Sequence, residues 1–294
     1  MPLLLIECLE RIESTFIKSC HANDPNLGLK TRIDQDIQIG LPCLPSASSD
    51  EYLEIIRGWV ELCDLQHKDS TCQHLSRGSS AASSYHGRLP TRVISVGSKG
   101  DPTVKLLETT PSDTGEWVAL SHQWGGGLQF STTRQNLRHH IQGISMDQLP
   151  ATFKDAVTVT RALGRPYLWI DSLCVIQGKD GDFDQEAKRM EQVYSGAYCV
   201  LAASRSPGHY AGFLQPRQAN DSVTMQRDGD SAPFYIRETI DDFQQHVLEG
   251  GLNQRGWVLQ EHALARRTVY FTDYQTYFEC GNGVHCETMT KMTK

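Results

Sequence analysis

Between residues 117 and 203, short apolar runs alternate with segments of helical periodicity. The runs 117–121, 167–176 and 199–203 have the length and composition of buried strands. Strands separated by helices of about ten to fifteen residues are typical of βαβ units, which build a parallel sheet covered by helices on both faces. The pattern therefore predicts an α/β fold in which three strand-end loops share the ligand-binding edge, namely those after Leu120, Ile170 and Ala203.

Two helices are expected between these strands. Pro150 is a typical helix-opening residue, and Gly164 suits the position just past the end of the same helix. A second helix is predicted after residue 183, because four apolar or small residues align on one face, namely Ala187, Met190, Tyr194 and Ala197.

The flanks of this region have a different character. Residues 1–50 are turn-rich and predict an irregular arm, whereas residues 51–65 have helical periodicity. Residues 76–87 are rich in Ser, Gly and Ala and predict a flexible linker. Two hairpins are expected, at 92–108 and 268–280, with a polar, inserted stretch at 220–231 and a strand near 234–237 between them.

Composition excludes several classes of protein. The 28 basic and 35 acidic residues give a formal charge of −7, without a Lys/Arg run that could follow a phosphate backbone, so a nucleic-acid partner is not expected. No apolar stretch has the length of a signal peptide or a membrane span. The nine cysteines are an odd number scattered over the chain, which favours reduced thiols and a cytoplasmic protein.

Asp171 lies in the middle of the apolar run 167–176. A carboxylate inside a buried strand is costly unless it is paired or hydrogen-bonded. The sequence therefore predicts either a chemical role for Asp171 or a structural ion pair with Arg92 or Arg255.

Several motifs, in their order along the chain, resemble the heterokaryon-incompatibility (HET) domain of filamentous fungi. They are Trp117-Val-Ala-Leu-Ser-His-Gln-Trp-Gly-Gly126, Leu149-Pro-Ala-Thr-Phe-Lys-Asp-Ala156, Tyr167-Leu-Trp-Ile-Asp-Ser-Leu-Cys-Val-Ile-Gln177, Val193-Tyr-Ser-Gly-Ala197 and Arg255-Gly-Trp-Val-Leu-Gln-Glu261. The resemblance implies a TIR/flavodoxin-like doubly wound, mainly parallel sheet with an N-terminal extension and a C-terminal β-hairpin. It divides the chain into an extension (1–90), the HET domain (91–287) and a tail (288–294).

The resemblance also implies a role in fungal non-self recognition and programmed cell death. Its core is similar to TIR domains, some of which cleave NAD, so NAD(P) glycohydrolase activity is one expectation. Glu186 stands where such enzymes keep a catalytic glutamate, and Asp171 is expected to brace that site. The first turn of a helix also favours a glutamate through the helix dipole alone, which is the structural alternative for Glu186.

The segment from Ser121 to Gly127 is a glycine-rich loop that follows a predicted strand. Its backbone amides could approach an anionic group, and the indole of Trp124 could stack on a base, so a nucleotide-binding loop is predicted from Ser121, His122, Trp124 and Gly125. The loop matches neither the Walker motif nor the G-x-G-x-x-G spacing. A tight turn with a core tryptophan is the alternative, and a Ser/His/Asp hydrolase is disfavoured because no G-x-S-x-G motif is present.

Residues 255–261 form a second polar and aromatic set. On a helix, Trp257 and Glu261 share one face with Gln260 beside them, so Arg255, Trp257 and Glu261 are further candidates for the ligand site. Glu261 competes with Glu186 as the acidic centre. A capping segment in which Arg255 pairs with an acid is the structural alternative.

A Cys/His cluster follows the first predicted helix, with the pattern Cys63-x3-His67-x4-Cys72-x-His74. These are zinc-ligating residue types, and Cys280 and Cys286 could complete a site. The spacing fits no standard finger, and buried cysteines also serve as small apolar residues.

Three functional interpretations remain open from the sequence. The first is an NAD-hydrolysing signalling protein, the second is a non-enzymatic module that self-associates or binds a signalling partner, and the third is an enzyme repurposed for small-molecule biosynthesis. The third rests on His122-Gln123, which replaces the Tyr-Cys usual in the family. Phe183 likewise replaces a common tryptophan, and both changes lie near the expected ligand edge.

Overall fold

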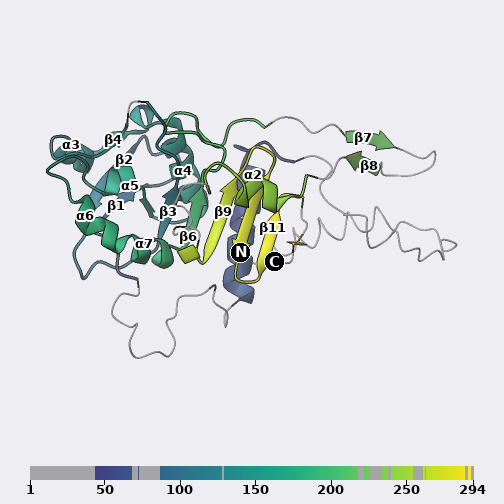
Figure 1. Cartoon of the computed structure of the whole chain (residues 1–294), viewed down its shortest axis with the longest axis horizontal. Helices are drawn as coiled ribbons and strands as arrows, with labels where there is room; N and C mark the ends of the chain where they lie inside the picture. The colour runs from purple at the N-terminus through teal and green to yellow at the C-terminus, as the bar shows by residue number, and fades with distance from the viewer. Residues whose placement is uncertain are drawn as a thin grey trace.

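A computed structural model gives the fold of the chain (Figure 1). The residues that it describes are 44–67, 72, 87–127, 129–217, 222–225, 234–237, 240–253, 261, 263–288 and 291–292. Most of the predicted N-terminal arm and of the linker lies outside this part of the chain, as do the residues His74, Arg255, Trp257 and Gln260. Within the described part, no helix is both long enough and apolar enough to cross a membrane.

A sheet of ten strands organises the described residues, in the order β12-β11-β10-β9-β6-β3-β5-β1-β2-β4. Its four central strands are parallel, each paired with the next in register. They are β5 (Tyr167–Trp169), β3 (Trp117–Ser121), β6 (Cys199–Ala202) and β9 (Arg267–Phe271). β3, β6 and β9 are buried along their whole length, which explains why their sequences are mainly apolar.

Antiparallel strands extend the parallel centre on both sides. One side carries β1 (Arg92–Ser95), β2 (Thr103–Glu108) and β4 (Ile144–Ser145). The other carries β10 (Thr276–Cys280), β11 (Gly283–Cys286) and β12 (Lys291–Met292). Both predicted hairpins are confirmed, as β1–β2 and β9–β10. The α/β class is also confirmed, but the expectation of a mainly parallel sheet is wrong, because these hairpins add antiparallel pairs at each flank.

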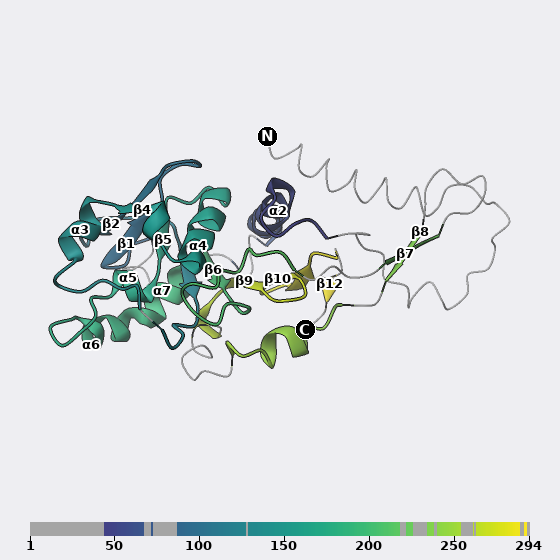
Figure 2. The ribbon, with the colours of Figure 1, turned by 90° about the horizontal axis from the view of Figure 1, so that it is seen from above.

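Helices lie on both faces of the sheet. Figure 2 shows α2 (Asp50–Gln66) and α4 (Ala151–Ala162) on one face, and α6 (Phe183–Glu186) and α7 (Met190–Gly196) on the other. The remaining helical turns are α3 (Leu137–Gln142), η2 (Met146–Gln148), α5 (Asp171–Cys174), η3 (Ala187–Arg189) and the π-helical turn η4 (Gln244–Leu248). A separate two-stranded sheet pairs β7 (Ser222–Met225) with β8 (Phe234–Arg237), the strand expected there.

The helix ends follow local sequence signals. The Ser49 hydroxyl caps α2 by accepting a hydrogen bond from the Tyr52 backbone N–H at 3.2 Å. Pro150 is the N-cap of α4, and Gly164 follows its end with a φ of +66°, as predicted.

Two predicted elements differ from the structure. The run 167–176 is not one strand, because β5 ends at Trp169 and the chain turns into α5 at Asp171. Leu168 to Ile170 and Leu173 to Ile176 are nevertheless buried in both parts. The apolar pattern therefore indicates burial, and it does not show that the backbone is extended. The helix predicted after residue 183 is divided into α6, η3 and α7.

The N-terminal helix packs on the C-terminal strands. Trp59 of α2 stacks on Phe278 of β10 with 6.3 Å between ring centroids, and the Tyr52 hydroxyl hydrogen-bonds the Thr276 hydroxyl at 2.6 Å. Asp64 forms an ion pair with Arg267 at the start of β9 at 2.5 Å. The buried residues of α2 therefore belong to the same hydrophobic core as the central strands.

Candidate functional site

Three loops meet at one edge of the sheet, as predicted. Because β3, β5 and β6 are parallel, their carboxyl ends lie at the same edge. Ala119 of β3 pairs in register with Trp169 of β5, so Ser121 and Asp171, each two residues further on, leave neighbouring strands at the same level. Adjacent strands are about 4.8 Å apart, which brings the two residues into one small area.

The loop after β3 is held against the loop after β6. Gly125 has a φ of +75°, and a Cβ atom there would lie 3.0 Å from the Pro207 carbonyl oxygen and 3.1 Å from the Gly208 Cα. Glycine is therefore needed both for the backbone conformation and for the close approach. This contact fixes Trp124, the preceding residue, at the edge.

Asp171 is held by two donors at this edge. The Trp124 indole Nε1 donates to Asp171 Oδ2 at 2.8 Å, and the Ser172 backbone N–H donates to Oδ1 at 2.6 Å. His122 Nδ1 lies 3.8 Å from Oδ1. The Asp171 side chain is 24% exposed, so it remains accessible while it is held in position. Arg92, one of the ion-pair partners suggested for Asp171, pairs with Asp182.

A second carboxylate reaches the same edge. The Ser121 hydroxyl donates to Glu261 Oε2 at 2.5 Å, although 140 residues separate them in sequence. Ser121 is buried, whereas Glu261 is partly exposed. The structure thus brings together five of the predicted site residues, namely Ser121, His122, Trp124, Asp171 and Glu261, with Gly125 beside them.

His209 joins this set, although sequence reasoning missed it. Its ring lies 5.1 Å from that of His122 and 5.8 Å from that of Trp124, measured between centroids. The Phe130 backbone N–H donates to His209 Nδ1 at 3.2 Å, which places the ring proton on Nε2. Burial, reinforced by the neighbouring His122, lowers the pKa of His209 to about 4. A lone histidine in a polar loop gives no sequence signal for such a position.

Glu186 lies at the same edge but on the far side of β5. It accepts hydrogen bonds from the Thr91 hydroxyl at 3.0 Å and from Arg189 Nη1 at 3.2 Å, and its side chain is 6% exposed. Thr91 precedes β1, which is antiparallel to β5, so Thr91 belongs to the edge at which β5 ends. Since β1 and β3 flank β5, Thr91, which holds Glu186, is separated from Ser121 by two strand spacings, or roughly 10 Å across the sheet.

Comparison with known protein families identifies the segment that contains this edge. Residues 117–261 match the family model described as heterokaryon incompatibility protein (HET). This segment of the chain is a HET domain. The match begins at Trp117, the first residue of β3, and ends at Glu261, so it includes both members of the Ser121–Glu261 hydrogen bond. Searches of the curated proteins and of the solved structures found no match to the chain.

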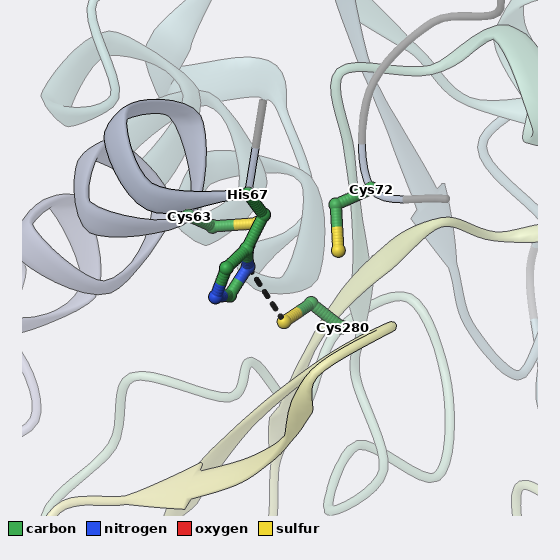
Figure 3. A group of neighbouring side chains, drawn as sticks. All are labelled: Cys63, His67, Cys72 and Cys280. Carbon is green, nitrogen blue, oxygen red and sulfur yellow. Dashed lines mark hydrogen bonds between the residues drawn. The ribbon is translucent and has the colours of Figure 1, made fainter. Parts of the chain in front are cut away.

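The Cys/His cluster lies outside the matched segment, on both sides of it in sequence. Cys63, His67 and Cys72 gather around Cys280, the last residue of β10 (Figure 3). Cys286 is placed elsewhere, with its sulfur 3.0 Å from the Thr288 hydroxyl. A hydrogen bond from Cys63 lowers the pKa of the Cys280 thiol below its usual value, although burial acts in the opposite direction.

Proposed function

We propose that the HET domain binds NAD or a related nucleotide at the carboxyl edge of β3 and β5 and hydrolyses its N-glycosidic bond. This activity would serve fungal non-self recognition and cell-death signalling. The observation that carries the proposal is the Ser121–Glu261 hydrogen bond beside the Trp124–Asp171 hydrogen bond. Together they gather two carboxylates, a hydroxyl and an indole next to the ends of neighbouring strands.

The strand order supports a nucleotide site at this position. The parallel strands run β5-β3-β6-β9, so the chain leaves β3 for one neighbour and later returns to the other. In doubly wound sheets ligands bind where the strand order reverses, and the flavodoxin-like order begins in the same way. The Ser121 end of β3 is at that reversal.

The side chains suit cleavage of a ribosyl bond. In the proposed reaction the bond between ribose C1′ and the nicotinamide nitrogen breaks, and nicotinamide leaves with the electron pair as a neutral molecule. A carboxylate stabilises the oxocarbenium-like centre that remains, and a water molecule adds to C1′ and releases a proton. The products are nicotinamide, ADP-ribose and that proton.

We assign the stabilising carboxylate to Glu261 rather than to Glu186. Glu261 is partly exposed, and the hydrogen bond from the Ser121 hydroxyl orients its carboxylate at the strand end. Glu186 is nearly buried, with its side chain 6% exposed, so a substrate could reach it less easily. Asp171 is the positioning residue of this scheme, because it orients the Trp124 indole on which a base could stack.

Nicotinamide release from NAD by the purified chain tests both the proposed hydrolysis and the assignment of Glu261. We expect turnover by the wild type and a loss of about 10²–10³-fold in Glu261→Gln. Glu186→Gln should stay within a few fold, as should Glu191→Gln, which changes an exposed glutamate of α7 and serves as the matched control. Thermal unfolding of each variant shows whether the fold is retained.

Three results would overturn the proposal. Absence of turnover by the wild type at high protein concentration, with nucleotide-independent oligomers, would favour a non-enzymatic module. Full activity of Glu261→Gln together with an inactive Glu186→Gln would refute the assignment of the carboxylate. Equal losses in all three variants, including Glu191→Gln, would show that the activity does not arise at this edge.

A further inference from the structure

Four metal-ligating side chains from three separate segments meet between the end of α2 and the end of β10. Cys63 and His67 are four residues apart at the end of α2 and therefore share one face of the helix. Cys72 follows on the next segment, and Cys280 ends β10. One ligand atom of each residue lies within 4.8 Å of all the others, and Figure 3 shows the side chains pointing toward a common centre.

Two distances from His67 match those of a tetrahedral site. Zn–S bonds of about 2.3 Å and Zn–N bonds of about 2.0 Å place tetrahedral ligand atoms roughly 3.5 Å apart for N and S and roughly 3.8 Å apart for two sulfurs. His67 Nδ1 lies 3.3 Å from Cys63 Sγ and 3.6 Å from Cys280 Sγ. Since all four ligand atoms lie within 4.8 Å of one another, no pair needs to approach by more than about 1 Å to surround an ion.

Backbone donors point at the sulfurs. The Gly281 N–H donates to Cys72 Sγ at 3.2 Å, and the Asn282 N–H donates to Cys280 Sγ at 3.5 Å. Such donors stabilise thiolates, the form of cysteine that binds metal. Hydrogen bonding among the side chains alone is a poor explanation of the cluster, because His67 Nδ1 faces two sulfurs and can accept only one proton.

The other nitrogen of His67 is also held. His67 Nε2 lies 2.7 Å from the side-chain amide of Asn282. The two ends of an amide are assigned from their surroundings, so Asn282 can present its oxygen to a protonated Nε2. That arrangement fixes the ring with Nδ1 toward the three sulfurs, as the outer partner of a metal-bound histidine does.

We propose that Cys63, His67, Cys72 and Cys280 bind one structural Zn²⁺ ion. Three sulfurs and one nitrogen are the donor set of closed tetrahedral zinc sites, and they leave no position for a substrate. The ion would join α2 to β10 and thus connect residues that precede and follow the HET match. This inference is independent of the proposed hydrolysis.

Metal content of the purified chain tests the site. We expect about one zinc per chain by elemental analysis and a strong loss of zinc in Cys280→Ser. Cys286→Ser should keep its zinc, because the Cys286 sulfur lies beside Thr288 and outside the cluster. It is a matched control, since Cys286 is in the same hairpin as Cys280 and a serine there can still hydrogen-bond Thr288. His67→Cys should also retain the metal, whereas His67→Ala should bind it weakly.

A second measurement uses the wild type alone and therefore does not depend on whether the variants fold. Chelation of the wild type should lower its unfolding temperature by on the order of 10 °C, since the ion closes a loop of more than 200 residues. Zinc chloride should restore the original value, and magnesium chloride should not. The proposal is refuted if the wild type binds no zinc, if Cys280→Ser keeps a full equivalent, or if mass spectrometry finds a disulfide among the three cysteines.

Discussion

The buried ion pair between Arg217 and Glu287 offers the sharpest test of what stabilises the fold. The Glu287 side chain is 0% exposed and the Arg217 side chain 8%. Arg217 donates to both carboxylate oxygens, with Nη2 2.8 Å from Oε1, and the Thr276 backbone N–H also donates to Oε2. Glu287→Gln would replace one acceptor with a donor that faces other donors, and it would leave the guanidinium buried without its counter-charge.

Breaking one partner of a buried pair costs about 3–5 kcal/mol of unfolding free energy. At roughly 2–4 °C per kcal/mol, the unfolding temperature of Glu287→Gln should fall by roughly 6–20 °C. Thermal and guanidinium unfolding would both measure this loss. The double variant Arg217→Met with Glu287→Leu should be less destabilised than Glu287→Gln, because it leaves no unpaired charge.

The exposed pair between Lys99 and Asp50 provides the matched control. Their side chains are 81% and 75% exposed, although Nζ and Oδ1 are only 2.8 Å apart. Lys99→Ala should cost less than about 1 kcal/mol, because water screens an exposed pair. A loss below about 1 kcal/mol in Glu287→Gln as well would refute the claim that burial decides the energy of the Arg217–Glu287 pair.

Three further predictions concern other parts of the fold. Gly125→Ala should cost about 1–2 kcal/mol in thermal unfolding, because it combines a positive φ with a close backbone contact, whereas Gly126→Ala, which meets nothing within 4 Å, should be nearly neutral. Trp59→Ala should cost about 3–5 kcal/mol, and Leu65→Ala on the exposed face of the same helix less than about 1 kcal/mol. The pKa of His209 is lowered from 6.5 to about 4. Between these pH values the histidine is protonated in the unfolded chain and neutral in the folded chain. The free energy of unfolding should therefore fall by up to about 3 kcal/mol as the pH drops from about 6.5 to 4, and this fall should be absent from His209→Asn. If the two proteins lose the same stability over this pH range, His209 is not the group responsible.

The elements that sequence predicts well are those set by local signals. Helix α2 has an N-cap serine and an apolar stripe, and Gly164 supplies the left-handed residue that ends α4. The hairpins are likewise local, since their strands are close in sequence. The end of β5 was missed because a short apolar run fits a buried helical turn as well as a strand, and periodicity cannot separate them.

The sequence identifies only some residues of the candidate site, because the others are brought in by contacts between distant parts of the chain. A strand-end loop identifies Ser121 and Trp124, and the unusual position of Asp171 identifies that residue. Their partners follow only from tertiary structure, because Glu261 and Asp171 are distant in sequence from the side chains that they contact. Cys280 was likewise one of two candidates to complete the Cys/His cluster, and only the register of β10 places it there.

The packing of α2 on β10 has a consequence for synthesis of the chain. The helix is complete at Gln66, but Phe278, on which Trp59 stacks, is added 212 residues later. At about 5–20 residues per second, the apolar face of α2 waits roughly 10–40 s on the ribosome for its partner strand. During that interval a chaperone or a neighbouring nascent chain can occupy the face of α2 that β10 later covers.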